Sequence, residues 1–90
     1  MSTQICASFG LAVKRLRETK GWSQERLAEL SDLNRSYVGE IERGIVVPSL
    51  VTLKKLADAL DLSGSDLMAH SERIHQSRVV RGIQLTAIAC

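Results

Sequence analysis

The sequence predicts a single all-α domain built from five short helices. The chain has 90 residues, and since domains usually hold about 100–200 residues, it has room for only one hydrophobic core. Apolar residues recur every three or four positions over most of residues 1–70, which is the spacing of one helix face. Serine, asparagine and glycine residues interrupt this pattern where short helices would begin and end. We expect residues 1–70 to form the domain and residues 71–90 to form a C-terminal extension.

The first expected helix ends before Gly21. Ile5, Phe9, Val13 and Leu16 recur at i, i+4, i+8 and i+11, so they share one face of a helix. The opposite face is charged, which indicates a helix that buries one side and exposes the other. Gly21 can adopt the left-handed conformation that terminates helices.

Two very short helices are expected next. Ser23 is a favourable N-cap for the first, Asn34 is a favourable N-cap for the second, and Gly44 ends the second. Isolated helices below about 12–15 residues are marginal in water, so both must pack on their neighbours. The residues expected to face inward are Leu27, Ala28, Leu33, Val38 and Ile41. Those expected to face outward from the second helix are Asn34, Arg35, Ser36, Tyr37, Gly39 and Glu40.

The fourth and fifth helices are predicted by two further caps. Ser49 caps the fourth helix, and Ser63 with Asp66 resembles a capping box that opens a short fifth helix containing Leu67. The apolar stripe of the fourth helix is Leu50, Leu53, Leu56, Ala57 and Leu60. The structure of residues 71–90 stays open, because part of this segment alternates as in a strand and part repeats as in a helix. The alternating residues are Ile83, Leu85 and Ala87, and the helical repeat is Ile74, Arg78, Arg81, Leu85 and Ile88.

Composition argues against several functional classes. No apolar run reaches the about 18–20 residues of a membrane span, and no signal peptide is visible, so we expect a cytoplasmic protein. The only histidines, His70 and His75, are too isolated for a metal site, and Cys6 and Cys90 are interpreted as free thiols. No catalytic constellation or phosphate-binding loop is evident. We therefore expect no enzymatic activity and no cofactor.

Charge is distributed unevenly along the chain. Residues 1–21 carry a net charge of +3, residues 22–71 of −3 and residues 72–90 of +2, which gives the overall +2. This near-neutral total does not by itself indicate a nucleic-acid partner. Binding to nucleic acid would depend on a local basic face.

The two short helices carry the strongest functional signal. A pair of this length joined by a three- or four-residue turn has the shape of a helix-turn-helix, whose second helix enters the major groove of DNA. The residues around the pair form three segments. They are Ser23-Gln24-Glu25-x-Leu27-Ala28, then Tyr37-Val38-x-x-Ile41-Glu42-Arg43-Gly44, and then Pro48-Ser49-Leu50-x-Thr52-Leu53-x-x-Leu56-Ala57-x-Ala59-Leu60.

In these segments the chain resembles the Cro/repressor-type, Xre-like helix-turn-helix family over roughly residues 8–69. This family includes phage repressors and restriction–modification controller proteins. The resemblance implies a five-helix, lambda-repressor-like fold and a bacterial regulator of transcription. It would bind a palindromic operator in double-stranded DNA as a homodimer, with the recognition helix, residues 34–43, in the major groove.

The resemblance also implies roles for individual residues. The positions that match base contacts are Asn34, Arg35, Ser36 and Glu40, and those that match phosphate contacts are Gln24, Tyr37 and Arg43. Two of these keep an alternative, because Asn34 could act only as a helix cap and Glu40 could only orient a neighbouring arginine. Arg17 and Glu42 match a structural ion pair.

The chain departs from the family pattern in three places, one of which is the C-terminal twenty residues, which lie outside that pattern. Asp32 replaces the usual glycine of the turn, and aspartate tolerates a left-handed backbone better than most residues. The loop after Gly44 is often basic in relatives, whereas here it is Ile45-Val46-Val47. This apolar loop either packs locally or forms part of a partner surface.

We expect the dimer to form through the end of the domain. The interface candidates are Leu62, Leu67 and Met68, together with the tail residues Ile74, Val79, Val80, Ile83 and Leu85. The alternative function is an antitoxin-like or other interaction module that binds a partner protein as well as DNA, through the apolar loop and tail.

Overall fold

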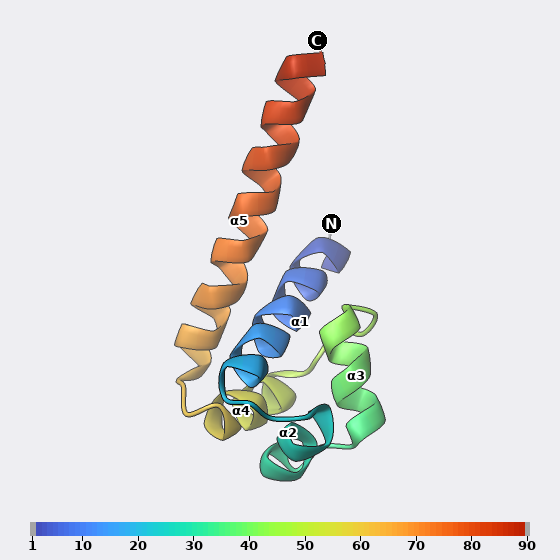
Figure 1. Cartoon of the computed structure of the whole chain (residues 1–90), viewed down its shortest axis with the longest axis vertical. Coiled ribbons are helices and arrows are strands. Elements are labelled where there is room, and N and C mark those ends of the chain that lie inside the picture. Colours follow the sequence, from blue (N-terminus) through green and yellow to red (C-terminus); the bar gives the residue numbers. More distant parts are fainter. Residues whose placement is uncertain (1, 90) are drawn as a thin grey trace.

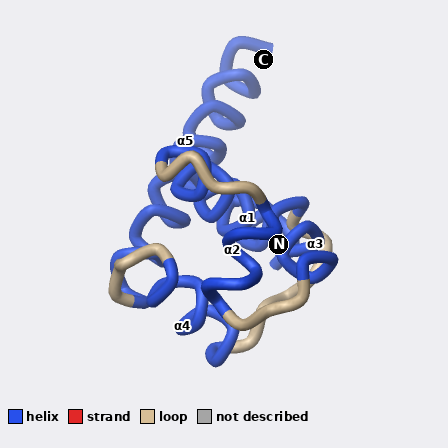
Figure 2. Tube along the Cα trace, turned by 60° about the horizontal axis from the view of Figure 1, so that its bottom comes forward, coloured by secondary structure: helices blue, strands red, loops and turns tan. Residues whose placement is uncertain are grey.

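The expected all-α architecture is confirmed by a computed structural model, which describes the backbone of residues 2–89 and the side chains of residues 4–77. The helices are α1 (Ser2–Thr19), α2 (Gln24–Ser31), α3 (Arg35–Arg43), α4 (Leu50–Ala59) and α5 (Gly64–Ala89), with no strand in this part of the chain. Helix α1 lies in the middle and packs against α5 on one side and α3 on the other (Figure 1). Helices α2 and α4 close one end, and short loops join the helices (Figure 2).

Each expected N-cap accepts the hydrogen bond that its position requires. The side-chain oxygens of Ser23, Ser49 and Ser63 accept from the backbone N–H three residues later at 3.0, 3.1 and 3.0 Å. Asn34 Oδ1 accepts from Ser36 N–H at 2.8 Å. These bonds satisfy N–H groups that the first turn of a helix leaves unpaired. The beginnings of α2, α3, α4 and α5 are therefore set by local residues.

A left-handed residue follows each of the first four helices, and after α4 this residue is Asp61, with a φ of 60°. Gly21 has a φ of 72° and Gly44 a φ of 75°, as expected. Asp32 has a φ of 56° and ends α2, so it adopts the conformation usually taken by glycine in this turn. The N–H of Leu33 then donates to the carbonyl oxygen of Ala28 at 2.9 Å. This bond pairs one of the carbonyl groups that the last turn of α2 leaves without a partner within the helix.

Helix α5 is much longer than the short fifth helix expected from the sequence. It runs without interruption from Gly64 to Ala89, so the strand-like alternation near its end is not a strand. The buried face continues past residue 70, because Leu67 and Ser71 are both fully buried and Ile74 is half-buried at the same helical spacing. The boundary expected after residue 70 falls inside this helix, and the division into domain and extension stays a prediction. Among the described residues, no helix has the length and apolar composition of a membrane span.

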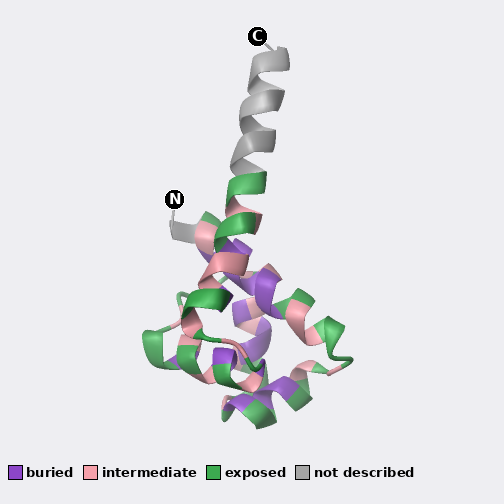
Figure 3. Ribbon diagram, turned by 90° about the vertical axis from the view of Figure 1, so that its left-hand side faces the viewer, coloured by how far each residue is buried: buried purple, intermediate pink, exposed green. Residues whose placement is uncertain are grey.

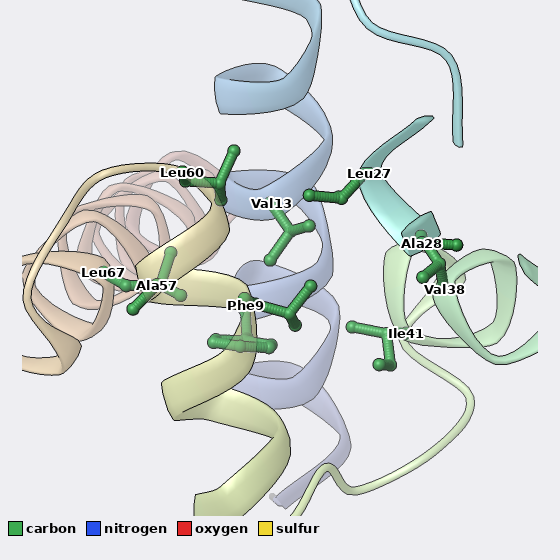
Figure 4. Packing of buried hydrophobic residues seen from close by; sticks show 10 residues of the cluster. Phe9, Val13, Leu27, Ala28, Val38, Ile41, Ala57, Leu60 and Leu67 are labelled. Carbon is green, nitrogen blue, oxygen red and sulfur yellow. The ribbon is translucent and has the colours of Figure 1, made fainter. Parts of the chain in front are cut away.

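The core is aliphatic and draws on all five helices. Phe9 and Val13 of α1 stand at its centre, between residues of α2 and α3 on one side and residues of α4 and α5 on the other (Figure 4). The buried cluster is Phe9, Val13, Leu27, Ala28, Val38, Ile41, Leu56, Ala57, Leu60 and Leu67. Of the inward residues expected around the turn, Leu33 is only partly buried. Buried segments of each helix alternate with exposed ones along the chain (Figure 3).

Two expectations about apolar residues are wrong. Leu67 cannot contribute to a dimer surface, because it is 0% exposed and fills the core between α4 and α5. Leu50 does not belong to the buried stripe of α4, because it is 82% exposed at the first position of the helix. Val79, Val80, Ile83 and Leu85 lie outside the residues whose side chains the structure describes.

Helix α1 touches the end of α3 backbone to backbone. A Cβ atom on Gly10 would collide with the carbonyl oxygen of Ile41 and stand 2.7 Å from the carbonyl oxygen of Glu42. A Cβ on Gly44 would stand 2.6 Å from Cα of Ala7. Glycine is needed at both positions for the helices to approach this closely. The sequence offered one hint of this contact, since Gly10 is an isolated glycine inside a strongly helical segment.

We expect Gly10→Ala to destabilise the protein by about 1–3 kcal/mol, although alanine normally favours a helix. The cause is the collision with the Ile41 carbonyl group, which α3 can relieve only by moving away. Urea unfolding followed by circular dichroism measures the effect. Gly64→Ala is the matched control, because a Cβ there meets nothing within 4 Å and should be neutral or stabilising. Equal stability of the two variants would contradict the close contact.

Candidate DNA-binding surface

The exposed start of α3 carries most of the residues expected to read bases. Asn34, Arg35 and Ser36 are exposed there, and Glu40 is half-exposed one turn later. Arg35 forms no ion pair with any described residue. Its guanidinium group is therefore available to a ligand outside the chain. Asn34 acts as a cap in the free protein, since its Oδ1 accepts from Ser36 N–H, while its side-chain NH₂ group makes no bond to a described residue.

Tyr37 lies apart from this group. Its ring is half-buried and packs on the core, and its hydroxyl oxygen lies 3.4 Å from Oγ1 of Thr52 in the first turn of α4. Thr52 Oγ1 in turn accepts a hydrogen bond from Ser49 Oγ at 3.1 Å. The 3.4 Å separation is long for a bond between hydroxyl groups, so the Tyr37 hydroxyl is weakly held and stays available to another acceptor.

Gln24 and Arg43, both expected to contact phosphate, each approach the middle of α3 at Gly39. Gly39 separates them and is buried, which contradicts the expectation that it faces outward. From the point where a Gly39 Cβ would stand, Nη1 of Arg43 is 3.3 Å away and Oε1 of Gln24 is 3.7 Å away. The two side chains cover the glycine, which explains why it is inaccessible on an otherwise open face.

Arg17 and Glu42 form the ion pair that the family resemblance implied. Arg17 Nε donates to Glu42 Oε2 at 2.7 Å and Arg17 Nη2 donates to Glu42 Oε1 at 3.0 Å. The side chains of Arg17 and Glu42 are 12% and 3% exposed. Arg17 Nη1 also donates to the carbonyl oxygen of Trp22 at 2.7 Å. The pair therefore joins the end of α1, the loop before α2 and the last turn of α3.

The contacts with Glu42 stabilise the charged form of Arg17. Its hydrogen bonds to Glu42 raise the pKa of Arg17 above its already high ordinary value; burial opposes this, and the negative charge of Glu42 adds to it. Arginine is protonated throughout the usual pH range, so Arg17 contributes no titration there. Arg17 therefore keeps its positive charge beside Glu42 throughout that range.

Glu42 has a third partner that the sequence did not indicate. Gln24 Nε2 donates to Glu42 Oε1 at 3.0 Å, so one carboxylate links α1, α2 and α3. A carboxylate only accepts hydrogen bonds, hence the NH₂ group of Gln24 must face it and the carbonyl oxygen must face away. No local pattern could have shown this bond, because the two residues are 18 positions apart.

To bind a metal ion, the described part of the chain would need several ligating side chains placed together. No group of three or more histidine, cysteine, aspartate or glutamate side chains is placed there to hold an ion. Cys6 is a buried free thiol.

Two short helices, a tight turn held by Asp32 and an exposed polar start of α3 define a helix-turn-helix DNA-binding domain. Residues 13–67 match the helix-turn-helix family. The chain belongs to this family of transcriptional regulators.

The similar proteins include a control protein and two restriction–modification controller proteins. The control protein C.BamHI of Bacillus amyloliquefaciens is 39% identical over 69 residues, which cover 76% of this chain and 85% of that protein. The crystal structure of the controller protein C.AhdI from Aeromonas hydrophila is 52% identical, with a TM-score of 0.67, over 69% of this chain and 94% of that one. The structure of the C.Esp1396I tetramer in complex with its natural 35 base-pair operator is 25% identical, with a TM-score of 0.73, over 80% and 95%.

Removing one partner of the Arg17–Glu42 pair should be costly. We expect Arg17→Met to destabilise the protein by about 3 kcal/mol, because Glu42 is then left as an uncompensated buried charge. The double variant Arg17→Met/Glu42→Leu should recover much of that loss. Urea unfolding measures both. Lys54→Met is the control, since the Lys54–Asp58 pair is exposed and should contribute well under about 1 kcal/mol. A loss as small as that of the control would contradict a structural role for the pair.

Proposed function

We propose that this protein regulates transcription by binding a specific palindromic site in double-stranded DNA as a homodimer, with α3 in the major groove. The observation that carries the proposal is the exposed start of α3, with the Gln24 and Arg43 side chains beside Gly39 in the middle of the same helix. The first group can read bases and the second can hold the backbone. A catalytic step has no part in this proposal, and the protein would act in the cytoplasm.

Arg35 is the principal base reader in this proposal. A guanidinium group can donate two parallel bonds to O6 and N7 of guanine, which discriminates against other bases by about 1–3 kcal/mol. Asn34, Ser36 and Glu40 would add contacts from the same face. Glu40 suits the exocyclic amine of cytosine, which is a donor.

Gln24 and Arg43 would contact the DNA backbone. Gln24 is the first residue of α2, where unpaired backbone N–H groups and the helix dipole favour a phosphate. Tyr37 would donate its hydroxyl to a neighbouring phosphate, since its bond to Thr52 is long. These contacts position α3 without reading sequence.

The similar proteins support a controller-type regulator. C.BamHI is named a control protein, C.AhdI is named a restriction–modification controller protein, and the C.Esp1396I structure contains a natural operator. We propose that this chain likewise binds an operator. One recognition helix spans only a few base pairs, and a second copy placed one helical turn away would double the contacts.

The second copy has an apolar surface to cover. Val47, Leu50 and Val51 are 77%, 82% and 66% exposed and lie together at the start of α4. Beside them is an apolar groove of about 190 Å³ that Met68 helps to line. Exposed apolar patches of this kind mark interaction sites. We therefore propose that the dimer interface includes these residues with Met68 and Leu62, in place of Leu67.

A protein partner is the second candidate, in the manner of an antitoxin. The observation that favours it is the apolar loop, in which Ile45 is 62% exposed beside Val47. A heterologous partner would compete with the second copy for this surface. The two possibilities differ in the size of the purified protein, which is dimeric only in the first.

Arg35→Ala should relax sequence preference, whereas Gln24→Ala should weaken binding to all sequences alike. Selection of bound DNA from a random pool, followed by titration of the selected site at several salt concentrations, measures both. The wild-type affinity should fall steeply as salt rises, because phosphate contacts release counterions. An unchanged sequence preference in Arg35→Ala would refute the proposed reading face.

Leu50→Gln and Val51→Gln should each weaken dimerisation by about tenfold or more, because a polar group replaces a buried apolar one at the interface. Both residues are exposed in the monomer, so folding should be unaffected. Analytical ultracentrifugation measures the dimer dissociation constant. Leu30→Gln is the control, since Leu30 is also exposed but belongs to α2 and does not line this groove. A wild-type monomer at high concentration would overturn the dimer.

A further inference from the structure

Gly39 occupies an unexpected place for a glycine. It stands in the middle of α3, where glycine destabilises a helix relative to alanine. Its φ is not positive, so no left-handed backbone requires it. No neighbouring backbone approaches within 4 Å of its Cβ position either, in contrast to Gly10 and Gly44. The reason for this glycine must lie in the side chains around it.

Two side chains from different helices fill the space above Gly39. Arg43 Nη1 lies 3.3 Å from the Cβ position, and Oε1 and Nε2 of Gln24 lie 3.7 and 4.0 Å from it. The contact with Arg43 is the tight one, and the contacts with Gln24 are ordinary van der Waals distances. A methyl group at position 39 would therefore press on Arg43 first.

Gln24 and Arg43 differ in their freedom to move. Gln24 is held by its bond to Glu42, which is itself held by two bonds from Arg17. Arg43 is exposed and forms no ion pair with a described residue. A Cβ atom at position 39 would force Arg43 Nη1 to shift by a few tenths of an ångström, whereas Gln24 could stay in place. The present position of Arg43 over the helix therefore depends on the missing Cβ.

We propose that Gly39 is a positioning residue, which allows Arg43 to lie across α3 beside Gln24 so that both side chains donate to one phosphate group of the DNA. The inference rests on the proposed function and deepens it. Gln24 has a second amide proton besides the one given to Glu42, and the guanidinium group of Arg43 carries five donors. Charge-assisted bonds to phosphate are strong, and holding Arg43 in place before binding lowers the entropy lost on binding.

Gly39→Ala is the test, because it should maintain or raise the stability of the protein while it lowers the affinity for DNA. The thermal midpoint should stay the same or rise, since alanine favours the helix. Affinity should fall by about tenfold, by the same factor for the operator and for unrelated DNA, because a phosphate contact is weakened. Sequence preference should not change. Gly64→Ala is the matched control and should leave DNA binding unaltered, since its Cβ meets nothing.

A double-mutant cycle assigns the effect to Arg43. In an Arg43→Ala background, Gly39→Ala should cause no further loss of affinity, because no guanidinium remains to displace. An unchanged affinity in Gly39→Ala, a loss confined to the operator, or an equal loss in the Arg43→Ala background would each overturn the inference. A wild-type protein that binds no DNA would instead refute the proposed function, so the two failures are distinguishable.

Discussion

The carboxylate of Glu42 is the point on which the arrangement of the site depends. It stands in the last turn of α3 with 3% of its side chain exposed, so it needs partners in the interior. Arg17 of α1 supplies two hydrogen bonds and the compensating charge, and Gln24 of α2 supplies a third bond. Because these donors come from different helices, the three helix ends have to meet at one place. The angle of α3 relative to α2 is set there, and with it the exposed face of α3.

Close backbone packing reinforces the same contact. Gly10 and Gly44 let α1 and the end of α3 touch without side chains between them, next to the Arg17–Glu42 pair. This matters because α2 and α3 have 8 and 9 residues and would not be stable alone. Their stability is tertiary and comes from α1 and the aliphatic core. A rigid base of this kind suits recognition, since a small tilt of α3 would move every residue on its exposed face.

Local features could be predicted well and long-range ones poorly. The caps Ser23, Asn34, Ser49 and Ser63 were predictable because each bonds within three residues of itself. The Arg17–Glu42 pair came only from the family resemblance, since 25 positions separate the two residues. The Gln24–Glu42 bond and the close contact at Gly10 were missed. In the site, the exposed residues at the start of α3 followed from the helical period, whereas the burial of Gly39 did not.

The sequence by itself determined where most helices begin and end and which family the chain resembles, because caps, helical periodicity and motif spacing act over a few neighbouring residues. The tertiary structure decided which apolar and polar groups meet. It placed Leu67 in the core and left Leu50 on the surface, although both belong to helical apolar patterns. It showed that α5 continues past residue 70, where Arg73, Ile74 and Ser77 lie beside residues of α1. It also brought Arg43 and Gln24 together over Gly39. Such contacts depend on how the helices are oriented in space, which no short stretch of sequence specifies.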